Sequence, residues 1–352
     1  MPSYNTQMQE TIKEEDVLNL INRLVLPRKS FDFKANGAVS TEGKSPIIVH
    51  EGLDEIIDAL LNGRVHKNNP DWIEALDRYW AREHAAAMFA IGLLNGRYED
   101  YLPGRYLMYK RLVDSGIKRI IEDTTDKKII ELGSGSGISL TMLAREGADV
   151  YGLDISETAL GFFELLARHY GIGDKIHTVR ENFYQTNFPD SHFDLAYNVG
   201  VFEHLSANDR EKLLVEMKRI TKPQGYTLIS VPNTNSPHYR EMRKREEMLF
   251  RKSKQFKFPM RDFHDLDPST LLQEAGFQIV RSGYVLLAPS VPIGRKIINP
   301  SDYEFFTTLP DINGGQIETK EKIKIWELLE KSATPEQKLR YGWFVYAIGK
   351  KL

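Results

Sequence analysis

The chain contains no cysteine, carries little net charge and has no long apolar run. Without cysteine it can form no disulfide, zinc–thiolate site or iron–sulfur cluster, and it has no cysteine nucleophile. The formal net charge of -2 gives no overall attraction to nucleic acid or to anionic membranes. No apolar run approaches the ~20 residues of a membrane span, and the polar, acidic start does not have the pattern of a secretory signal. We therefore expect a cytoplasmic protein with no membrane span, and a nucleic-acid partner is disfavoured, although a local basic patch could still attract one.

The 352 residues suffice for one large domain with an extension, or for two domains. Residues 1–110 place apolar side chains at helical spacing without alternating strands and helices, so we expect a mainly helical N-terminal extension or cap. The pattern then changes, and residues 111–352 are expected to form the main domain. Two inserts, at about 235–263 and 289–339, interrupt it.

Apolar strand-like runs alternate with amphipathic helices from about residue 127 onward. The strand-like runs cover residues 127–132, 149–155, 175–182, 193–200, 225–233, 277–287 and 341–351, and helical patterns cover 138–147, 156–171, 207–220 and 267–276. This order predicts an α/β domain with a Rossmann-like, doubly wound, mostly parallel sheet and helices on both faces.

A glycine-rich loop, "IIELGSGSG", lies where the first of these strands turns into a helix. Glycine lets the backbone turn sharply, and it lets a ligand approach main-chain N–H groups at the start of the helix. Asp154 ends the next strand, where a carboxylate can accept hydrogen bonds from both hydroxyls of a ribose. The strand, loop, helix, strand and acid together predict a ligand that contains a nucleoside, whereas the loop alone could be a tight turn and Asp154 a helix cap.

Two kinds of cofactor compete for such a loop. A nicotinamide dinucleotide site requires a small residue three positions after the second glycine, in the pattern G-x-G-x-x-G/A. Here the residue three positions after Gly135 is Ile138, which does not fit. The pattern is instead E-x-G-x-G-x-G, with Glu131 inside the strand. A carboxylate so close to the loop would repel a pyrophosphate and suits a cationic ligand.

This motif resembles the first motif of the class I S-adenosylmethionine-dependent methyltransferases, in which an acidic residue precedes alternating glycines. Further segments match in order: Asn182 and Phe183, at the position that holds the adenine, then "FPDSHFDLAYNVGVFEHL", then "ITKPQGYTLISVPN", where Gln224 replaces a glycine. The second segment is similar to that of the small-molecule methyltransferases of ubiquinone and menaquinone biosynthesis. The resemblance covers about residues 120–288 and the last strand, and it implies a seven-stranded sheet whose last strand is antiparallel.

The resemblance implies S-adenosylmethionine as the cofactor. It implies that Gly133 and Gly135 approach the methionyl part, that Glu131 lies near the ammonium group and that Asp154 binds the ribose. The full set of cofactor-binding residues expected from it is Glu131, Gly133, Ser134, Gly135, Gly137, Asp154, Ile155, Asn182, Phe183 and Asn198.

The expected reaction is methyl transfer to oxygen, nitrogen or carbon of a small-molecule acceptor, a metabolite or natural product. The step is an in-line displacement at a carbon that is already electrophilic, so alignment and exclusion of water supply most of the catalysis. A general base is needed only where the acceptor keeps its proton at neutral pH, and His204 and His264 are the candidates. The pair Glu203–His204 could equally be a helix start or a buried structural pair. No metal is expected, because the aspartate-rich pattern of metal-dependent catechol enzymes is not evident.

Other chemistries are excluded or stay open. Methylation of a base at C5 through a cysteine adduct is excluded, and the N/D-P-P-Y/F motif of amino methylation is missing, since Asn198 is followed by Val-Gly-Val. Asn198 also replaces the aspartate that aminopropyl transfer uses. A protein or RNA acceptor, a non-catalytic S-adenosylmethionine-binding or partner-binding protein, and a nicotinamide oxidoreductase remain as alternatives.

Acceptor specificity is expected to lie in the N-terminal extension and the two inserts, none of which carries a recognisable motif. We expect the extension to shape the acceptor pocket, and a homodimer through its helices is a further hypothesis. The basic segment 240–261 has two interpretations, a solvated helix face or a cover that attracts an acidic or phosphorylated substrate. The sequence does not identify the acceptor.

Overall fold

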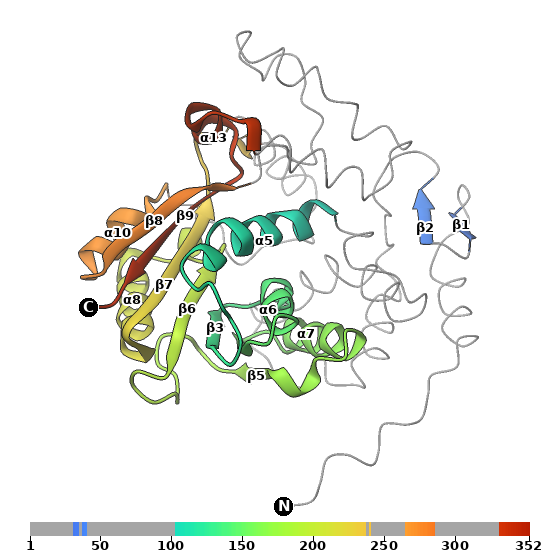
Figure 1. Ribbon diagram of the computed structural model, residues 1–352, viewed down its shortest axis with the longest axis horizontal. Helices are drawn as coiled ribbons and strands as arrows, with labels where there is room; N and C mark the ends of the chain where they lie inside the picture. The colour runs from blue at the N-terminus through green and yellow to red at the C-terminus, as the bar shows by residue number, and fades with distance from the viewer. Residues whose placement is uncertain (1–30, 35–36, 41–102, 237–238, 241–264, 286–330) are drawn as a thin grey trace, which may run out of the picture.

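The computed structural model describes residues 31–34, 37–40, 103–236, 239–240, 265–285 and 331–352 of the chain (Figure 1). The expectations for His264, for most of the basic segment and for most of the N-terminal extension lie outside these residues. Within the extension, which was expected to be mainly helical, β1 (Phe31–Lys34) pairs antiparallel with β2 (Gly37–Ser40) as a short hairpin. The expected domain boundary at residue 110 falls inside α5 (Pro103–Ser115).

A seven-stranded sheet in the order β5-β4-β3-β6-β7-β9-β8 forms the centre of the main domain. The strands are β3 (Lys128–Leu132), β4 (Asp149–Asp154), β5 (Ile176–Arg180), β6 (Phe193–Val199), β7 (Thr221–Pro232), β8 (Gln278–Val285) and β9 (Phe344–Lys350). β3 to β7 pair in parallel, whereas β9 runs antiparallel to both of its neighbours. The predicted doubly wound sheet with an antiparallel last strand is confirmed. Its strand order reverses between β3 and β6, the switch point of such folds.

Helices cover both faces of the sheet, with α5 to α7 on one side and α8 and α10 on the other (Figure 1). Their bounds are α6 (Ile138–Ala144), α7 (Glu157–His169), α8 (Ala207–Ile220), α10 (Pro268–Glu274) and α13 (Pro335–Tyr341); short 3-10 turns are η1 (Ile117–Arg119), η2 (Gly173–Lys175) and η3 (Phe202–His204). Ser156 caps α7, since its Oγ accepts a hydrogen bond from the N–H of Ala159 (3.1 Å). A side-chain oxygen at this position satisfies a helix N–H that has no partner within the helix.

Two apolar clusters lie against the two faces. Ile129 of β3 packs in the cluster that holds Leu140 and Phe163, and Ile130 packs in the cluster that holds Leu213. Successive side chains of a strand point to opposite faces, so a strand covered on both sides is apolar at nearly every position. This explains why Ile129, Ile130 and Leu132 of β3 are apolar, with Glu131 as the exception.

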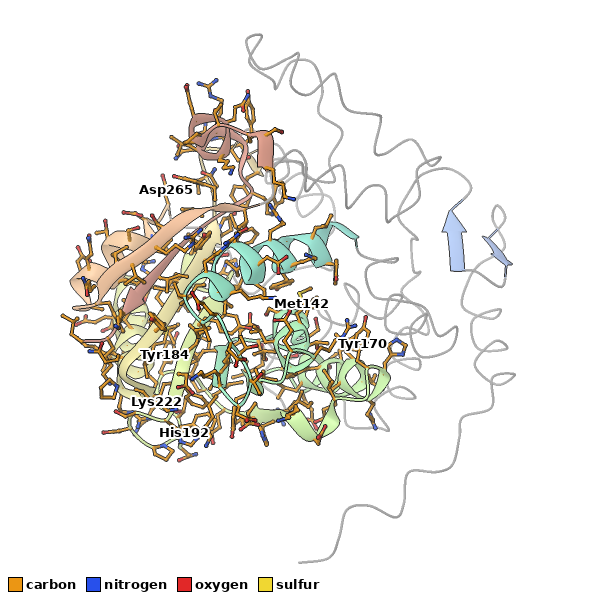
Figure 2. All side chains as sticks on the ribbon, in the orientation of Figure 1. Met142, Tyr170, Tyr184, His192, Lys222 and Asp265 are labelled. Carbon is orange, nitrogen blue, oxygen red and sulfur yellow. The ribbon has the colours of Figure 1, made fainter. Side chains whose placement is uncertain are left out.

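Asp194 lies at the amino edge of the sheet, away from the ends that face the glycine loop. Its Oδ2 accepts hydrogen bonds from the N–H of Lys128 (2.9 Å) and from Nζ of Lys222 (2.9 Å). Figure 2 labels Lys222 and His192 together at this end of the sheet. Asp194 therefore ties the starts of three strands, β3, β6 and β7.

Candidate functional site

The carboxyl ends of β3, β4, β5 and β6 meet at one edge of the sheet, because these four strands are parallel. The edge includes the switch point between β3 and β6, where open α/β sheets bind their ligands. Most of the residues predicted to bind a cofactor lie in the segments that leave these strand ends. The topology thus brings together residues that are far apart in the chain.

All three glycines of the loop between β3 and α6 adopt left-handed backbone conformations. Their φ angles are +78° at Gly133, +51° at Gly135 and +63° at Gly137, values that residues with a Cβ rarely adopt. A Cβ at Gly133 would lie 2.7 Å from Val201 Cγ2, and one at Gly137 would lie 2.3 Å from the ring of Phe163. Backbone conformation and the packing of the protein's own side chains therefore already require glycine at these two positions.

The N–H groups of the loop are largely used within the protein. Those of Gly133 and Ser134 donate to the carbonyl of Leu153 (2.8 and 3.0 Å), and that of Gly137 donates to the carbonyl of Ser134 (3.0 Å). A phosphate-binding loop instead directs its N–H groups at the anion. This arrangement argues against the pyrophosphate of a dinucleotide and agrees with the exclusion that Ile138 suggested.

Asp154 orders the same loop from the neighbouring strand. Its Oδ2 accepts a hydrogen bond from the N–H of Gly135 (2.9 Å), and its Oδ1 accepts one from the N–H of Ser156 (2.8 Å). The side chain is buried. The carboxylate predicted to bind a ribose thus also holds the glycine loop against the start of α7. The carbonyl of the next residue, Ile155, accepts a hydrogen bond from Nε of Arg180 (3.3 Å).

Glu131 is buried on the face of β3 that α6 covers. Its Oε2 accepts hydrogen bonds from Ser139 Oγ (2.6 Å) and from the hydroxyl of Tyr197 (2.9 Å). Within the described parts of the chain, its Oε1 has no hydrogen-bond partner. Burial raises the pKa of Glu131 to about 8, the two hydroxyl bonds oppose this, and the charge of Asp154 adds to it. An uncharged or cation-paired Glu131 is the stable form in such a site.

Asn198 lies at the end of β6, beside the switch point. Its Nδ2 donates to the carbonyl of Leu132, and its side chain is fully buried. Its Oδ1 has no partner among the residues that the structure describes. Asn198 thus joins the ends of β3 and β6 and leaves one acceptor atom unused at this edge.

Asn182 and Phe183 follow β5, at the same edge as Asp154. Asn182 is exposed, and its Oδ1 accepts a hydrogen bond from the N–H of Tyr184 (3.0 Å). Phe183 is half-buried, and its ring meets that of Tyr184 edge to face at 4.8 Å. The amide of Asn182 is therefore engaged in a local turn, and Phe183 offers an apolar surface beside it.

Glu203 and His204 form η3, directly after β6. Glu203 Oε1 lies 3.8 Å from His204 Nε2, and both side chains are almost entirely buried. Burial raises the pKa of Glu203 to about 8, although its own backbone N–H opposes this. Glu203 Oε2 has no partner within the described residues. The sequence motif predicted the pair Glu203–His204. Nothing in the sequence indicated that the carboxyl of Glu203 is buried. The second predicted base, His264, lies outside the described residues.

The described ranges contain neither a cluster of metal ligands nor a membrane-spanning helix. No group of three or more His, Asp or Glu side chains there is arranged to hold a metal ion. None of the helices described has the length and apolar character that crossing a bilayer requires.

The residues of this edge fit a nucleoside ligand with a cationic end. Asp154 ends β4 as a buried carboxylate, and Glu131 presents a buried carboxyl oxygen without a partner among the described residues. A buried acceptor left without a hydrogen bond costs about 1–3 kcal/mol, so a donor is expected to satisfy it. Val201, which packs against Gly133, closes the loop from the side of β6.

Part of the chain is similar in sequence to known proteins. Residues 130–229 match the family described as methyltransferase domain. Ubiquinone biosynthesis O-methyltransferase of Paraburkholderia phymatum is 31% identical over 115 residues, which are 33% of this chain and 48% of that protein. A sterol 24-C-methyltransferase of Gibberella zeae is 32% identical over 99 residues, 28% of this chain and 26% of that protein. The chain thus spans less than half the length of these two relatives.

Solved structures include similar chains. Geranyl diphosphate C-methyltransferase from Streptomyces coelicolor has a TM-score of 0.45 and 15% identity, over 81% of this chain and 100% of that one. A SAM-dependent methyltransferase from Archaeoglobus fulgidus has a TM-score of 0.42 and 20% identity, over 69% and 94%. The family match begins inside β3 and ends inside β7. Residues 130–229 are therefore similar to the methyltransferase domain family.

Proposed function

We propose that the protein transfers the methyl group of S-adenosylmethionine to oxygen, nitrogen or carbon of a small-molecule acceptor. One observation carries the proposal: Asp154 and the orphan oxygen of Glu131 flank a glycine loop whose N–H groups are mostly used internally. Such an edge suits a nucleoside with a positive charge and does not suit a pyrophosphate.

Each residue of the edge has a role in this proposal. Asp154 accepts hydrogen bonds from the ribose, and Glu131 attracts the ammonium of the methionyl group. Phe183 packs against the adenine, with Asn182 at its rim. When bound, S-adenosylmethionine supplies an electrophilic methyl carbon. The chain orients the two reactants and excludes water, which is the larger part of catalysis for such a displacement.

His204 is the proposed general base for acceptors that keep their proton at neutral pH. Glu203 Oε1 lies 3.8 Å from His204 Nε2, and a proton on His204 would favour the ionised form of Glu203. His264 keeps the same candidate role from the sequence alone. The N-terminal extension and the inserts are proposed to shape the acceptor pocket, and the extension to form any dimer.

The two curated relatives support a small-molecule acceptor. One is named for O-methylation in ubiquinone biosynthesis and the other for C-methylation of a sterol. Their names differ in the acceptor atom, so they support the class of acceptor and leave the atom open.

The test uses the full chain with S-adenosylmethionine labelled in its methyl group. Small-molecule, protein and RNA fractions of a cell extract are offered separately. We expect label in the small-molecule fraction and much less with Asp154→Asn. Label found only in the protein or RNA fraction would show that the acceptor is a macromolecule and would contradict the proposed small-molecule acceptor. Binding of S-adenosylhomocysteine without label in any fraction would favour a non-catalytic protein.

A further inference from the structure

Three buried side chains behind the glycine loop form a closed triangle. Ser139 Oγ and the hydroxyl of Tyr197 both bond to Glu131 Oε2, at 2.6 and 2.9 Å, and they lie 2.8 Å from each other. All three residues are at most 1% exposed. They come from three elements, since Glu131 is on β3, Ser139 on α6 and Tyr197 on β6.

The two hydroxyls hold Oε2 of Glu131 by hydrogen bonds and form none with Oε1. Tyr197 lies directly opposite Glu131 in the parallel register of β3 and β6, so its hydroxyl reaches the carboxyl without distortion of the sheet. Phenylalanine and alanine would fill the same space without burying hydroxyls, and buried hydroxyls are costly unless they are bonded. Glu131 Oε1 meanwhile has no partner among the described residues. Both hydroxyls thus serve one purpose, which is to hold the carboxyl in one orientation.

We propose that Tyr197 and Ser139 are positioning residues, which hold Glu131 by Oε2 so that Oε1 receives the ammonium group of the methyl donor. The inference rests on the proposed function, because it needs a methionyl group at the glycine loop. It adds two residues that the motif does not contain. They act through Glu131 and touch neither reactant.

The charged groups around Glu131 predict that binding of the methyl donor releases a proton. The titratable groups that act on it are Asp154 from β4 and, through Tyr197, Tyr109 from α5; on α6 the described contact is the uncharged Ser139. With a pKa of about 8, Glu131 holds its proton at pH 7 in the free protein. An ammonium at Oε1 favours the carboxylate, so binding should release a proton and become tighter as the pH rises towards 8.

Calorimetry of the full chain tests this with two probes, S-adenosylhomocysteine and methylthioadenosine, which lacks the amino-acid part. Titrations at pH 7 in two buffers of different ionisation enthalpy count the protons. We expect Tyr197→Phe to weaken S-adenosylhomocysteine about tenfold and to leave methylthioadenosine unchanged, with Ser139→Ala acting in the same direction. Proton release should accompany only the first probe.

The matched control is Tyr346→Phe, which removes another buried tyrosine hydroxyl, bonded to the carbonyl of Ser115 at 3.0 Å. It should leave the ratio of the two affinities unchanged. Equal losses for both probes in Tyr197→Phe, or no loss, would overturn the positioning role while the proposed function stands. If the unmodified chain binds neither probe, the proposed function falls and this inference with it. If Tyr197→Phe does not fold, the ratio of the affinities for S-adenosylhomocysteine and methylthioadenosine is measured in Ser139→Ala instead.

Discussion

Glu216 on α8 and Glu131 on β3 are both buried glutamates of the same domain, but their surroundings differ. Glu216 Oε1 accepts hydrogen bonds from the N–H and Oγ1 of Thr186 (2.8 and 2.6 Å) and from Arg219 (2.6 Å), and its Oε2 accepts another from Arg219 (2.8 Å). Burial alone would raise its pKa, but the bonds from Arg219 and Thr186 lower it. For Glu131, two hydroxyl bonds do not outweigh burial, and the pKa is raised.

The difference separates a structural network from a site. Around Glu216 every carboxyl oxygen is satisfied, and the network ties α8 to the segment between β5 and β6. At the carboxyl edge, buried polar atoms lack partners among the described residues: Glu131 Oε1, Ser134 Oγ, Asn198 Oδ1, Glu203 Oε2, Ser230 Oγ and Ser236 Oγ. Proteins rarely leave such atoms unsatisfied, so their concentration at one edge supports the ligand site proposed there.

The largest expected effect comes from breaking the complete network. Glu216→Ala leaves Thr186 and Arg219 without their acceptor, and we expect the free energy of unfolding to fall by about 3 kcal/mol. Urea denaturation measures this. The matched variant Glu131→Gln should cost less than about 1 kcal/mol, because it replaces a carboxyl whose second oxygen is unpartnered in the described structure. Equal losses in both variants would erase the distinction between the two glutamates.

Asp154→Ala should weaken the binding of S-adenosylhomocysteine by about 1–3 kcal/mol, since it removes the hydrogen bond to the loop and the proposed ones to the ribose. Asp194→Ala is the matched control, because Asp194 holds backbone and Lys222 at the opposite edge of the sheet. It should lower stability without changing the affinity. Calorimetry on both folded variants decides, and an unchanged affinity in Asp154→Ala would refute the ribose role.

The pH dependence of stability should have opposite signs for the two kinds of glutamate. Glu131 and Glu203 keep their protons to about pH 8 when folded but lose them near 4.5 when unfolded, so between these values their contribution falls as the pH rises. The slope is at most about 1.4 kcal/mol per pH unit for each group. Glu216 has a lowered pKa, so its contribution is present above its unfolded pKa and is lost as the pH falls through the folded one.

Urea denaturation over a pH range that begins below the lowered pKa of Glu216 and ends at about 8 measures these slopes. Glu131→Gln and Glu203→Gln should each make the decline between pH 5 and 8 shallower, whereas Glu216→Gln should remove the gain that appears above its folded pKa. A Glu203→Gln profile parallel to that of the unmodified protein would contradict the raised pKa of Glu203.

The smallest effect is expected far from the site. Gln224 lies in the turn within β7 with a φ of +63°, and its N–H donates to the carbonyl of Lys351. Gln224→Gly should raise the free energy of unfolding by about 0.5–1 kcal/mol, because glycine adopts this conformation without strain. Gly133→Ala makes the reverse change at the site and should lower both stability and affinity. A loss of stability in Gln224→Gly would show that the left-handed turn is not strained.

The parts of the site that the sequence predicted are those that are local in the chain. The strand, the glycine loop and Asp154 lie within one βαβ unit, and periodicity and spacing are enough to place them. The doubly wound, mostly parallel sheet of the main domain followed from the alternation of strands and helices and from the family resemblance, whereas its strand order comes from the structure. Gln224 was recognised as a departure from the motif, and its left-handed backbone explains why the family carries glycine there.

The parts that could not be predicted depend on register and packing. Tyr197 meets Glu131 only because β6 pairs with β3 in one register across 66 residues of sequence, and no local pattern specifies that pairing. The burial of Glu203 likewise comes from elements that pack around η3. A third such feature is that N–H groups of the loop donate hydrogen bonds to the carbonyl of Leu153 and to Asp154. These N–H groups are therefore not available to bind a phosphate.

The central claim is tested most directly by calorimetry on the full chain, which compares the binding of S-adenosylhomocysteine with that of a nicotinamide dinucleotide. The account predicts one molecule of S-adenosylhomocysteine bound per chain and no binding of the dinucleotide, because the loop N–H groups and Glu131 offer no place to a pyrophosphate. Tight binding of the dinucleotide with none of S-adenosylhomocysteine would contradict it.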